Sequence, residues 1–226
     1  MGSLKVIARI KSDFPAKFGI PRQSGIVEEC GGTIIFEPEY RNPDALRGLE
    51  GFSHIWLLWG FSEAEVDGWS PTVRPPKLGG NKRMGVFATR SPFRPNSIGL
   101  SCVKLKKIEL HTPSGPQIHV LGADLLDGTP IYDIKPYLPF TDCRPEATGG
   151  FAESIDAEPL QVVIPYNLIL SLPQDTVVAL RKVLEQDPRP SYQNDPERVY
   201  GMEFREYEVK FSVIEGTLTV LDIQKR

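Results

Sequence analysis

Side chains able to bind an anion are concentrated in one short loop, residues 90–97. The loop combines two arginines, two prolines and small hydroxyl or amide residues: Arg90, Ser91, Pro92, Arg94, Pro95, Asn96 and Ser97. The prolines restrict the backbone, and most of the polar side chains can donate hydrogen bonds. A rigid, donor-rich loop of this kind suits an anionic or nucleotide-like ligand.

Two alternating runs, residues 85–89 and 98–105, flank this loop and are predicted to be the strands that position it. The surrounding charge supports the same interpretation. Residues 71–107 contain nine of the 26 Lys and Arg residues and none of the 29 Asp and Glu residues, although the whole chain has a net charge of −3. A single basic block on an acidic chain is typical of a protein that meets a polyanion or phosphate ligand with one face. The alternative is a solvated basic loop without a ligand.

Two further loops contain residues that could contact a ligand. Residues 17–25 include Pro21-Arg22-Gln23, and residues 127–130 form an Asp-Gly-Thr-Pro turn. The glycine of this turn would let a ligand approach the backbone closely beside a carboxylate. Local sequence alone fits an ordinary connector equally well for the first loop, and it favours a plain β-turn for the second.

Cysteine and histidine spacing argues against metal and disulfide chemistry. The three cysteines, Cys30, Cys102 and Cys143, are far apart and odd in number, so a disulfide framework or a CxxC site is not expected. The three histidines form no HExxH motif and no Cys/His pair with zinc-ligand spacing. No Gly-x-Gly-x-x-Gly motif follows a predicted strand, so a Rossmann-type cofactor site is not supported either.

The remaining pattern predicts a mainly β chain with a helix near its C-terminal end. Predicted strands cover residues 4–10, 32–36, 49–61, 108–110 and 117–121, and residues 207–214 and 217–223 form a hairpin. A helix is predicted over residues 173–186, and the Gly-rich residues 146–154 suggest a domain boundary. No window has the roughly 18 apolar residues of a membrane helix and no secretory signal is recognisable, so we expect a cytoplasmic protein that does not contact membranes.

Several of these runs resemble the TsaA-like family of TrmO-type tRNA methyltransferases. The resemblance extends in order over nearly the whole chain: residues 17–23, 52–56, 73–81, 85–100, 124–137, 187–192 and 199–201. It implies a single-sheet β-barrel domain over residues 1–146, a small α+β domain over residues 155–226, and a homodimer. It also implies an enzyme that transfers a methyl group from S-adenosylmethionine to N6 of N6-threonylcarbamoyladenosine, next to the anticodon of threonine tRNAs.

The resemblance places the cofactor contacts on the following residues: Pro21, Arg22, Gln23, Ser62, Glu63, Arg90, Leu100, Asp127, Gly128, Thr129 and Pro130. Arg22 or Arg90 could pair with the methionyl carboxylate, and Asp127 could accept from a hydroxyl or amino group. Ser62-Glu63 departs from the family pattern, in which His is followed by Lys or Gln. Ser62 can keep a hydrogen bond, whereas Glu63 changes the charge.

The basic block is predicted to contact the anticodon loop or the threonyl carboxylate through Arg74, Lys77, Lys82, Arg83 and Arg94. Asp133 and Tyr137 are the candidates for the group that accepts the substrate's proton. Two alternatives to a methyltransferase stay open on the residues alone. One is a non-catalytic nucleotide- or tRNA-binding module, and the other is an enzyme that acts on a small anionic metabolite.

Overall fold

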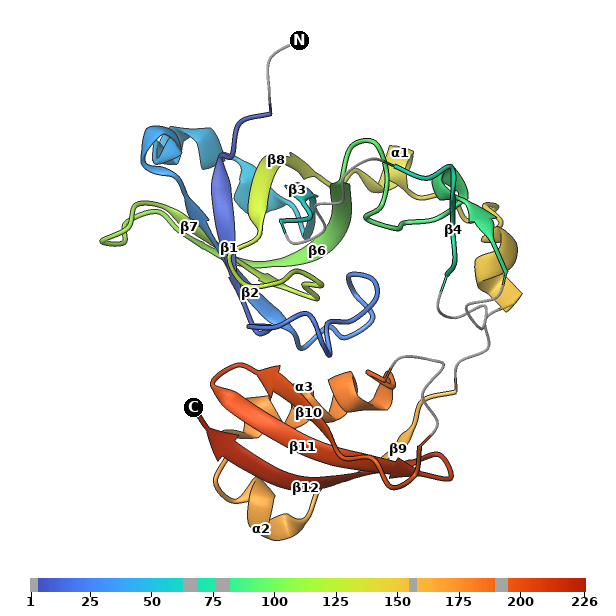
Figure 1. Cartoon of the computed structure of the whole chain (residues 1–226). Helices are drawn as coiled ribbons and strands as arrows, with labels where there is room; N and C mark the ends of the chain where they lie inside the picture. The colour runs from blue at the N-terminus through green and yellow to red at the C-terminus, as the bar shows by residue number, and fades with distance from the viewer. Residues whose placement is uncertain (1–3, 63–68, 76–81, 155–157, 190–194) are drawn as a thin grey trace.

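A computed structural model describes residues 4–62, 69–75, 82–154, 158–189 and 195–226. Six antiparallel strands close into a barrel in the order β1-β2-β7-β6-β3-β8, with β8 paired to β1 (Figure 1). These strands are β1 Ala8–Ser12, β2 Gly31–Phe36, β3 His54–Gly60, β6 Ile98–Glu109, β7 Gln117–Leu121 and β8 Pro130–Pro136. The predicted single-sheet β-barrel is confirmed.

The barrel forms because its strands alternate apolar and polar residues, which a pleated strand places on opposite faces. In β3, Ile55, Leu57 and Trp59 are buried and their neighbours up to Leu58 are half-buried. The core inside the barrel also contains Ala8, Ile10, Ile34, Phe36, Val103, Ile118, Val120 and Ile131. β3 pairs with β6 on one side and with β8 on the other, so it is a central strand, as its sequence predicts. The strand is shorter than predicted, because Leu49–Gly51 form a 3-10 turn instead.

The segments that border the predicted ligand loop are less regular than expected. Residues 85–89 are not a strand: β5 covers only Met84–Gly85 and pairs with β4, Thr72–Val73, while Val86–Ala88 form the 3-10 turn η5. The Thr89 backbone N–H caps this turn by donating to the Val86 carbonyl. On the other side of the loop, the two runs expected at residues 98–105 and 108–110 are one long strand, β6.

A second sheet, in the order β10-β11-β12-β9, lies below the barrel in Figure 1. Its strands are β9 Gln161–Val163, β10 Tyr200–Phe204, β11 Tyr207–Ile214 and β12 Thr217–Lys225. The helix α3, Gln174–Glu185, covers the sheet through Val177, Leu180, Val183 and Leu184. The predicted helix and hairpin are confirmed, whereas β10 was not predicted. Residues 158–189 and 195–226 are called the C-terminal part below.

Short helices complete the structure between these elements. The 3-10 turns η1 Pro38–Tyr40, η2 Pro43–Leu46 and η3 Leu49–Gly51 follow β2, and α1 Pro139–Asp142, η6 Gly150–Ser154 and α2 Tyr166–Ile169 lie later in the chain. The described residues form two buried clusters, one inside the barrel and one against the second sheet, and the second cluster also includes Phe14, Val27 and Cys30. Across the ranges described above, none of the helices has the length and apolarity required to cross a membrane.

Candidate functional site

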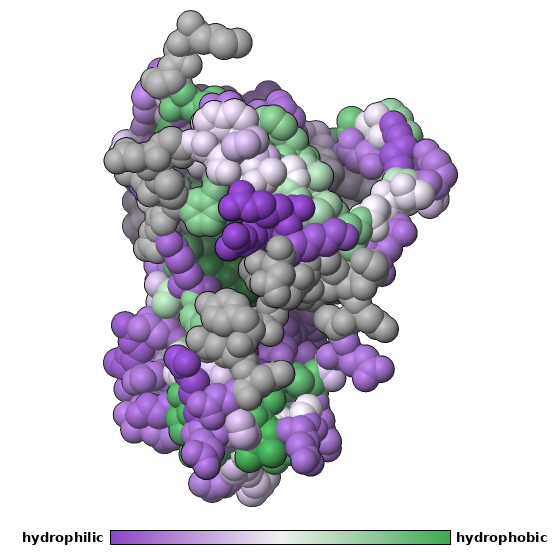
Figure 2. Space-filling model, turned by 45° about the vertical axis from the view of Figure 1, so that its right-hand side comes forward, coloured by the Kyte–Doolittle hydropathy of each residue, from purple (hydrophilic) through white to green (hydrophobic). Residues whose placement is uncertain are grey.

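A cavity of about 730 Å³ opens where the barrel meets the C-terminal part. Its walls come from five segments: residues 17–23, the end of β3 with the following residues 61–62, residues 89–96, the start of β6, and residues 124–129. Figure 2 shows an apolar hollow between the upper and lower halves of the molecule, flanked by strongly hydrophilic side chains. The volume is in the usual range for a site that encloses a small-molecule ligand.

The cavity brings together most of the residues predicted to bind the cofactor. The lining residues from this set are Pro21, Arg22, Gln23, Ser62, Arg90, Leu100 and Thr129. They come from all five of these segments, which meet because the barrel closes. Glu63 lies outside the described residues, as does Lys77 of the predicted nucleic-acid set.

Asp127, Gly128 and Pro130 were predicted to contact the cofactor, but they do not line this cavity. Asp127 Oδ1 accepts from the Ser12 backbone N–H at 2.9 Å, and the Gly128 N–H donates to the Ile10 carbonyl at 2.8 Å. Gly128 has φ +78°, in the left-handed region that favours glycine. The turn therefore uses its carboxylate and its glycine to fasten β1, and only Thr129 lines the cavity.

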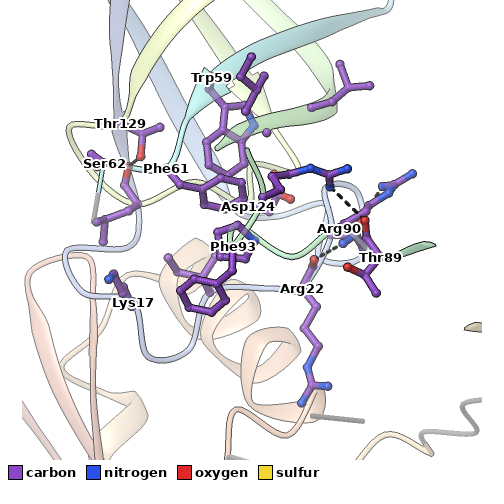
Figure 3. A pocket seen from close by; sticks show the side chains of 18 of the residues that line it. Lys17, Arg22, Trp59, Phe61, Ser62, Thr89, Arg90, Phe93, Asp124 and Thr129 are labelled. Atoms are coloured by element: carbon purple, nitrogen blue, oxygen red, sulfur yellow. Dashed lines mark hydrogen bonds between the residues drawn. The ribbon is translucent and has the colours of Figure 1, made fainter. Parts of the chain in front are cut away.

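Arg90 joins two of the predicted segments directly. Its Nη1 donates to Gln23 Oε1, so the loop after η5 and the loop after β1 are linked across the cavity. The Arg22 side chain is directed away from Trp59 and Asp124 and towards the C-terminal part (Figure 3), where the charge of Asp187 acts on it. Arg90 is therefore better placed than Arg22 to bind a carboxylate inside the cavity.

Asp124 is the residue of the cavity whose role the sequence did not indicate. Ser101 Oγ donates to Asp124 Oδ1 at 2.6 Å and accepts from Trp59 Nε1 at 2.9 Å, so three residues form one hydrogen-bonded row. Burial raises the pKa of Asp124, and hydrogen bonds from Ser101 and from backbone groups, with the charge of Arg90, oppose that rise. A half-buried carboxyl with a raised pKa is a candidate for proton transfer.

Neither Asp133 nor Tyr137, the predicted proton acceptors, lies on this cavity. Asp133 pairs with Lys135 at 2.9 Å and borders a different hollow beside β8. The Tyr137 ring packs beside His54 and Trp56, with ring centroids 6.2 and 5.8 Å away. The sequence gives no sign of the role of Asp124, because a lone Asp in the residues after a strand carries no local signal of burial.

The position of Trp59 in the cavity wall depends on a glycine opposite it in the neighbouring strand. Trp59 pairs with Gly99 in the β3–β6 register, and a Cβ atom at position 99 would lie 2.3 Å from Trp59 Cε2. Such a distance is impossible without moving the indole, which also donates to Ser101. Gly99 is therefore the residue that allows the Trp59–Ser101–Asp124 row to form.

We expect Gly99→Ala to lower the free energy of unfolding by about 1–3 kcal/mol, because the added methyl group overpacks the Trp59 ring. Urea denaturation followed by far-UV circular dichroism would measure the change. Gly85→Ala is the matched control, since φ there is −56° and no described atom lies within 4 Å of an added Cβ. Equal losses for the two variants would contradict the packing argument.

Basic and aromatic side chains are exposed in residues 69–75 and 82–94, the last part of which lines the cavity. Phe87 is 72% exposed, its ring lies 6.2 Å from that of Trp69, and the Arg94 guanidinium carbon lies 6.0 Å from its centroid. Arg94 also lines the cavity and donates to the Thr89 carbonyl at 3.0 Å. Arg74, Lys82 and Arg83 are exposed, and Arg83 Nη1 donates to Thr72 Oγ1 at 2.8 Å.

Comparison with known proteins gives matches over most of the chain. Residues 9–143 match the family model of the tRNA-methyltransferase O N-terminal domain, and residues 170–226 match that of the TrmO C-terminal domain. A tRNA (adenine(37)-N6)-methyltransferase of Escherichia coli strain K12 is 44% identical over 230 residues, which cover 97% of each chain.

Two Pseudomonas aeruginosa proteins are also similar. A putative S-adenosylmethionine-dependent methyltransferase named RcsF is 40% identical over 98% of this chain and 97% of its own. A crystal structure of TrmO from the same species superposes with a TM-score of 0.80 at 32% identity, covering 99% of this chain and 98% of that one.

Proposed function

The chain belongs to the tRNA-methyltransferase O (TrmO) family, and we propose that its substrate is N6-threonylcarbamoyladenosine at position 37 of threonine tRNAs. The enzyme is an S-adenosylmethionine-dependent methyltransferase that acts on adenine 37 of tRNA, as its relatives are named. The names of these relatives favour this activity over a non-catalytic binding module and over an enzyme that acts on a small anionic metabolite. The observation that carries the proposal is the cavity in which Arg90 and Asp124 lie together.

The residues of the cavity fit the chemical groups of S-adenosylmethionine. Arg90 can bind its carboxylate, and backbone or side-chain oxygens of the loop at residues 21–23 can accept from its amino group. Trp59, Phe61 and Phe93 provide aromatic surface for the adenine ring and for a sulfonium cation. When bound, S-adenosylmethionine supplies an electrophilic methyl group attached to sulfur.

The chain's own residues contribute alignment and a proton acceptor. Rigid loops and the barrel wall orient the reacting nitrogen towards the methyl group, which is catalysis by proximity. The N6 nitrogen loses its proton as it gains the methyl group, and we assign that proton to the carboxylate of Asp124. Hydrogen bonds from Ser101 and from the backbone groups of Ser24 and Asp124 hold this carboxylate in place at the cavity wall.

The exposed aromatic and basic residues support tRNA as the partner. Bases of a single-stranded anticodon loop can stack on aromatic rings, while Lys and Arg neutralise the phosphates. Phe87 with Trp69 and the exposed part of Phe93 lie in or beside the acid-free block of residues 71–107. Arg74, Lys82, Arg83 and Arg94 supply the positive charge that we propose contacts the anticodon stem-loop.

We expect Phe87→Ala to weaken tRNA binding by about 1–3 kcal/mol, the usual loss per stacked base. The dependence of log Kd on log salt concentration should not change, because no charge is removed.

Arg83→Ala should instead reduce the steepness of the dependence of log Kd on log salt concentration by about one unit, because it removes one positive charge. Filter binding at several salt concentrations would measure both effects. Tyr166→Ala, in helix α2 of the C-terminal part, removes an equally exposed ring and is the control for Phe87→Ala.

The substrate proposal is tested with labelled S-adenosylmethionine and two tRNA pools, one with and one without the threonylcarbamoyl group. Label that enters only the modified pool supports N6-threonylcarbamoyladenosine as the substrate. Label in both pools would leave adenine methylation standing and would refute the requirement for the modification.

We propose that residues 1–146 and 155–226 form two domains, with part of the first packed into the core of the second. We also propose that two copies form a homodimer and that the enzyme is located with tRNA in the cytoplasm. Exposed apolar side chains, including Phe140 at 85% and Leu170 at 68%, are candidates for burial between copies. Light scattering after size-exclusion chromatography would give the mass in solution.

A further inference from the structure

The segment between β1 and β2, residues 13–30, leaves the barrel and enters the hydrophobic core of the C-terminal part. Phe14, Val27 and Cys30 are at most 2% exposed and belong to the same buried cluster as Phe204 and Phe211. The rings of Phe14 and Phe204 meet edge to face, with centroids 5.7 Å apart. In Figure 1 this segment forms the loops that lie between the barrel and the lower sheet.

The same segment carries the tripeptide Pro21-Arg22-Gln23 that lines the cavity. Immediately before it, the Phe18 ring stacks on Phe211, with centroids 6.4 Å apart and planes inclined by 8°. A Cβ atom on Gly19, where φ is +98°, would lie 3.1 Å from Met202 Cε. The approach to the tripeptide is therefore packed directly against strands β10 and β11 of the C-terminal part.

Immediately after the tripeptide, the segment is attached to the barrel instead. Ser24 Oγ accepts from the Cys102 backbone N–H at 3.1 Å, and the Gly25 N–H donates to the Gly122 carbonyl at 2.9 Å. Residues 21–23 thus lie where the chain crosses from the C-terminal part to the barrel. Their position depends on both attachments.

Arg205 is the polar centre of the C-terminal attachment. Its Nε and Nη2 donate to the two carboxylate oxygens of Asp13 at 3.0 and 3.3 Å, and its backbone N–H donates to the Asp13 carbonyl at 2.7 Å. Its Nη1 donates to Asp175 and Thr176 of α3, each at 2.7 Å. The Arg205 and Asp13 side chains are only 19% and 15% exposed, so solvent screens their interaction weakly.

We propose that the C-terminal part positions the cofactor-binding loop, and that Arg205 is the positioning residue through which it does so. Residues 13–30 contain no helix or strand. Without the contacts of Arg205, this segment would have to become ordered when the cofactor binds, and the entropy lost would weaken binding. With those contacts, residues 21–23 are already held at the cavity wall. The inference rests on the proposed function, because it takes the cavity to be the S-adenosylmethionine site.

The test compares Arg205→Met with Arg226→Met in the full chain. Arg226 pairs with Glu203 in the same sheet and serves as the matched control. We expect Arg205→Met to raise the Kd of S-adenosylmethionine at least about tenfold by calorimetry, with kcat at saturating cofactor within about twofold. Amide hydrogen exchange over residues 13–30 should become faster. Arg205→Lys, which keeps one charged donor, should restore part of the affinity.

The possible outcomes separate the inference from the proposed function. If the unmodified chain binds no S-adenosylmethionine, the proposed function fails, while the exchange of residues 13–30 still reports whether Arg205 orders them. If Arg205→Met only lowers the melting temperature and leaves Kd and exchange unchanged, Arg205 is merely structural and the inference is overturned. Asp13→Asn, which weakens the same ion pair from the other side, gives a milder variant should Arg205→Met fail to fold.

Discussion

Asp124→Asn is expected to lower kcat for methyl transfer by about 100- to 10,000-fold, the usual contribution of a positioned general base. The amide keeps the size of the side chain and can still accept the hydrogen bond from Ser101. It cannot take the proton that N6 releases. The Kd of S-adenosylmethionine should change by no more than a few-fold, because the expected loss concerns the chemical step.

Single-turnover kinetics with saturating cofactor and tRNA would measure the loss, alongside calorimetry of cofactor binding. Asp133→Asn is the matched control, since this aspartate pairs with Lys135 away from the cavity. If Asp124→Asn raised the Kd of the cofactor strongly and left kcat unchanged, Asp124 would be a cofactor contact and not the proton acceptor.

The pH dependence of the same variant gives an independent check. Because burial raises the pKa of Asp124, the enzyme should lose activity as pH falls through that raised pKa, and Asp124→Asn should lack this limb. The free energy of unfolding changes with pH in the opposite direction to the activity. A carboxyl whose folded pKa exceeds its ordinary 3.8 costs stability as pH rises between the two values, since the folded state binds its proton more tightly. At neutral pH the variant should therefore melt no lower than the parent enzyme.

Arg90→Ala is expected to raise the Kd of S-adenosylmethionine by about 10- to 100-fold, equivalent to the loss of about 1.5–3 kcal/mol for a hydrogen bond between charged groups. The substitution removes the guanidinium that we assign to the methionyl carboxylate and frees Gln23 from its link to the loop. Arg90→Lys should recover only part of the affinity, because a lysine cannot form the two parallel hydrogen bonds of an arginine.

Calorimetric titration of the cofactor would measure the effect of Arg90→Ala. Arg47→Ala is the control, since the Arg47 side chain is 79% exposed and pairs with Asp44 outside this cavity. A Kd that stayed within twofold of the parent value would exclude Arg90 as the carboxylate ligand. Weaker tRNA binding with an unchanged cofactor Kd would instead place Arg90 among the nucleic-acid contacts.

Local sequence predicted those features of the fold that depend on neighbouring residues. The apolar, aromatic run of β3, the amphipathic stripe of α3 and the hairpin of β11 and β12 around Glu215-Gly216 are all short-range patterns, and each element was predicted from them. The run at residues 85–89 was predicted as a strand and is not one. Strand pairing depends on a partner elsewhere in the chain, and β4 offers it only two residues.

For the candidate site, the sequence by itself determined the chemistry that is available. The acid-free basic block and the rigid loop with Arg90 predicted an anionic or nucleotide-like ligand. The runs that resemble one family predicted the cofactor and the class of substrate. The sequence could not indicate which members of a run face the ligand. In residues 127–130 the turn directs Asp127 and Gly128 towards β1, while Thr129 lines the cavity.

Only the tertiary structure decided which distant residues meet. Barrel closure brings Trp59, Ser101 and Asp124 into one hydrogen-bonded row, and the core of the C-terminal part draws in Phe14 and fastens Asp13 to Arg205. These contacts depend on burying apolar surface across the whole chain, so no local pattern encodes them. The residue types specify what the cavity can bind, and the packing of the two cores specifies where each of those residues lies.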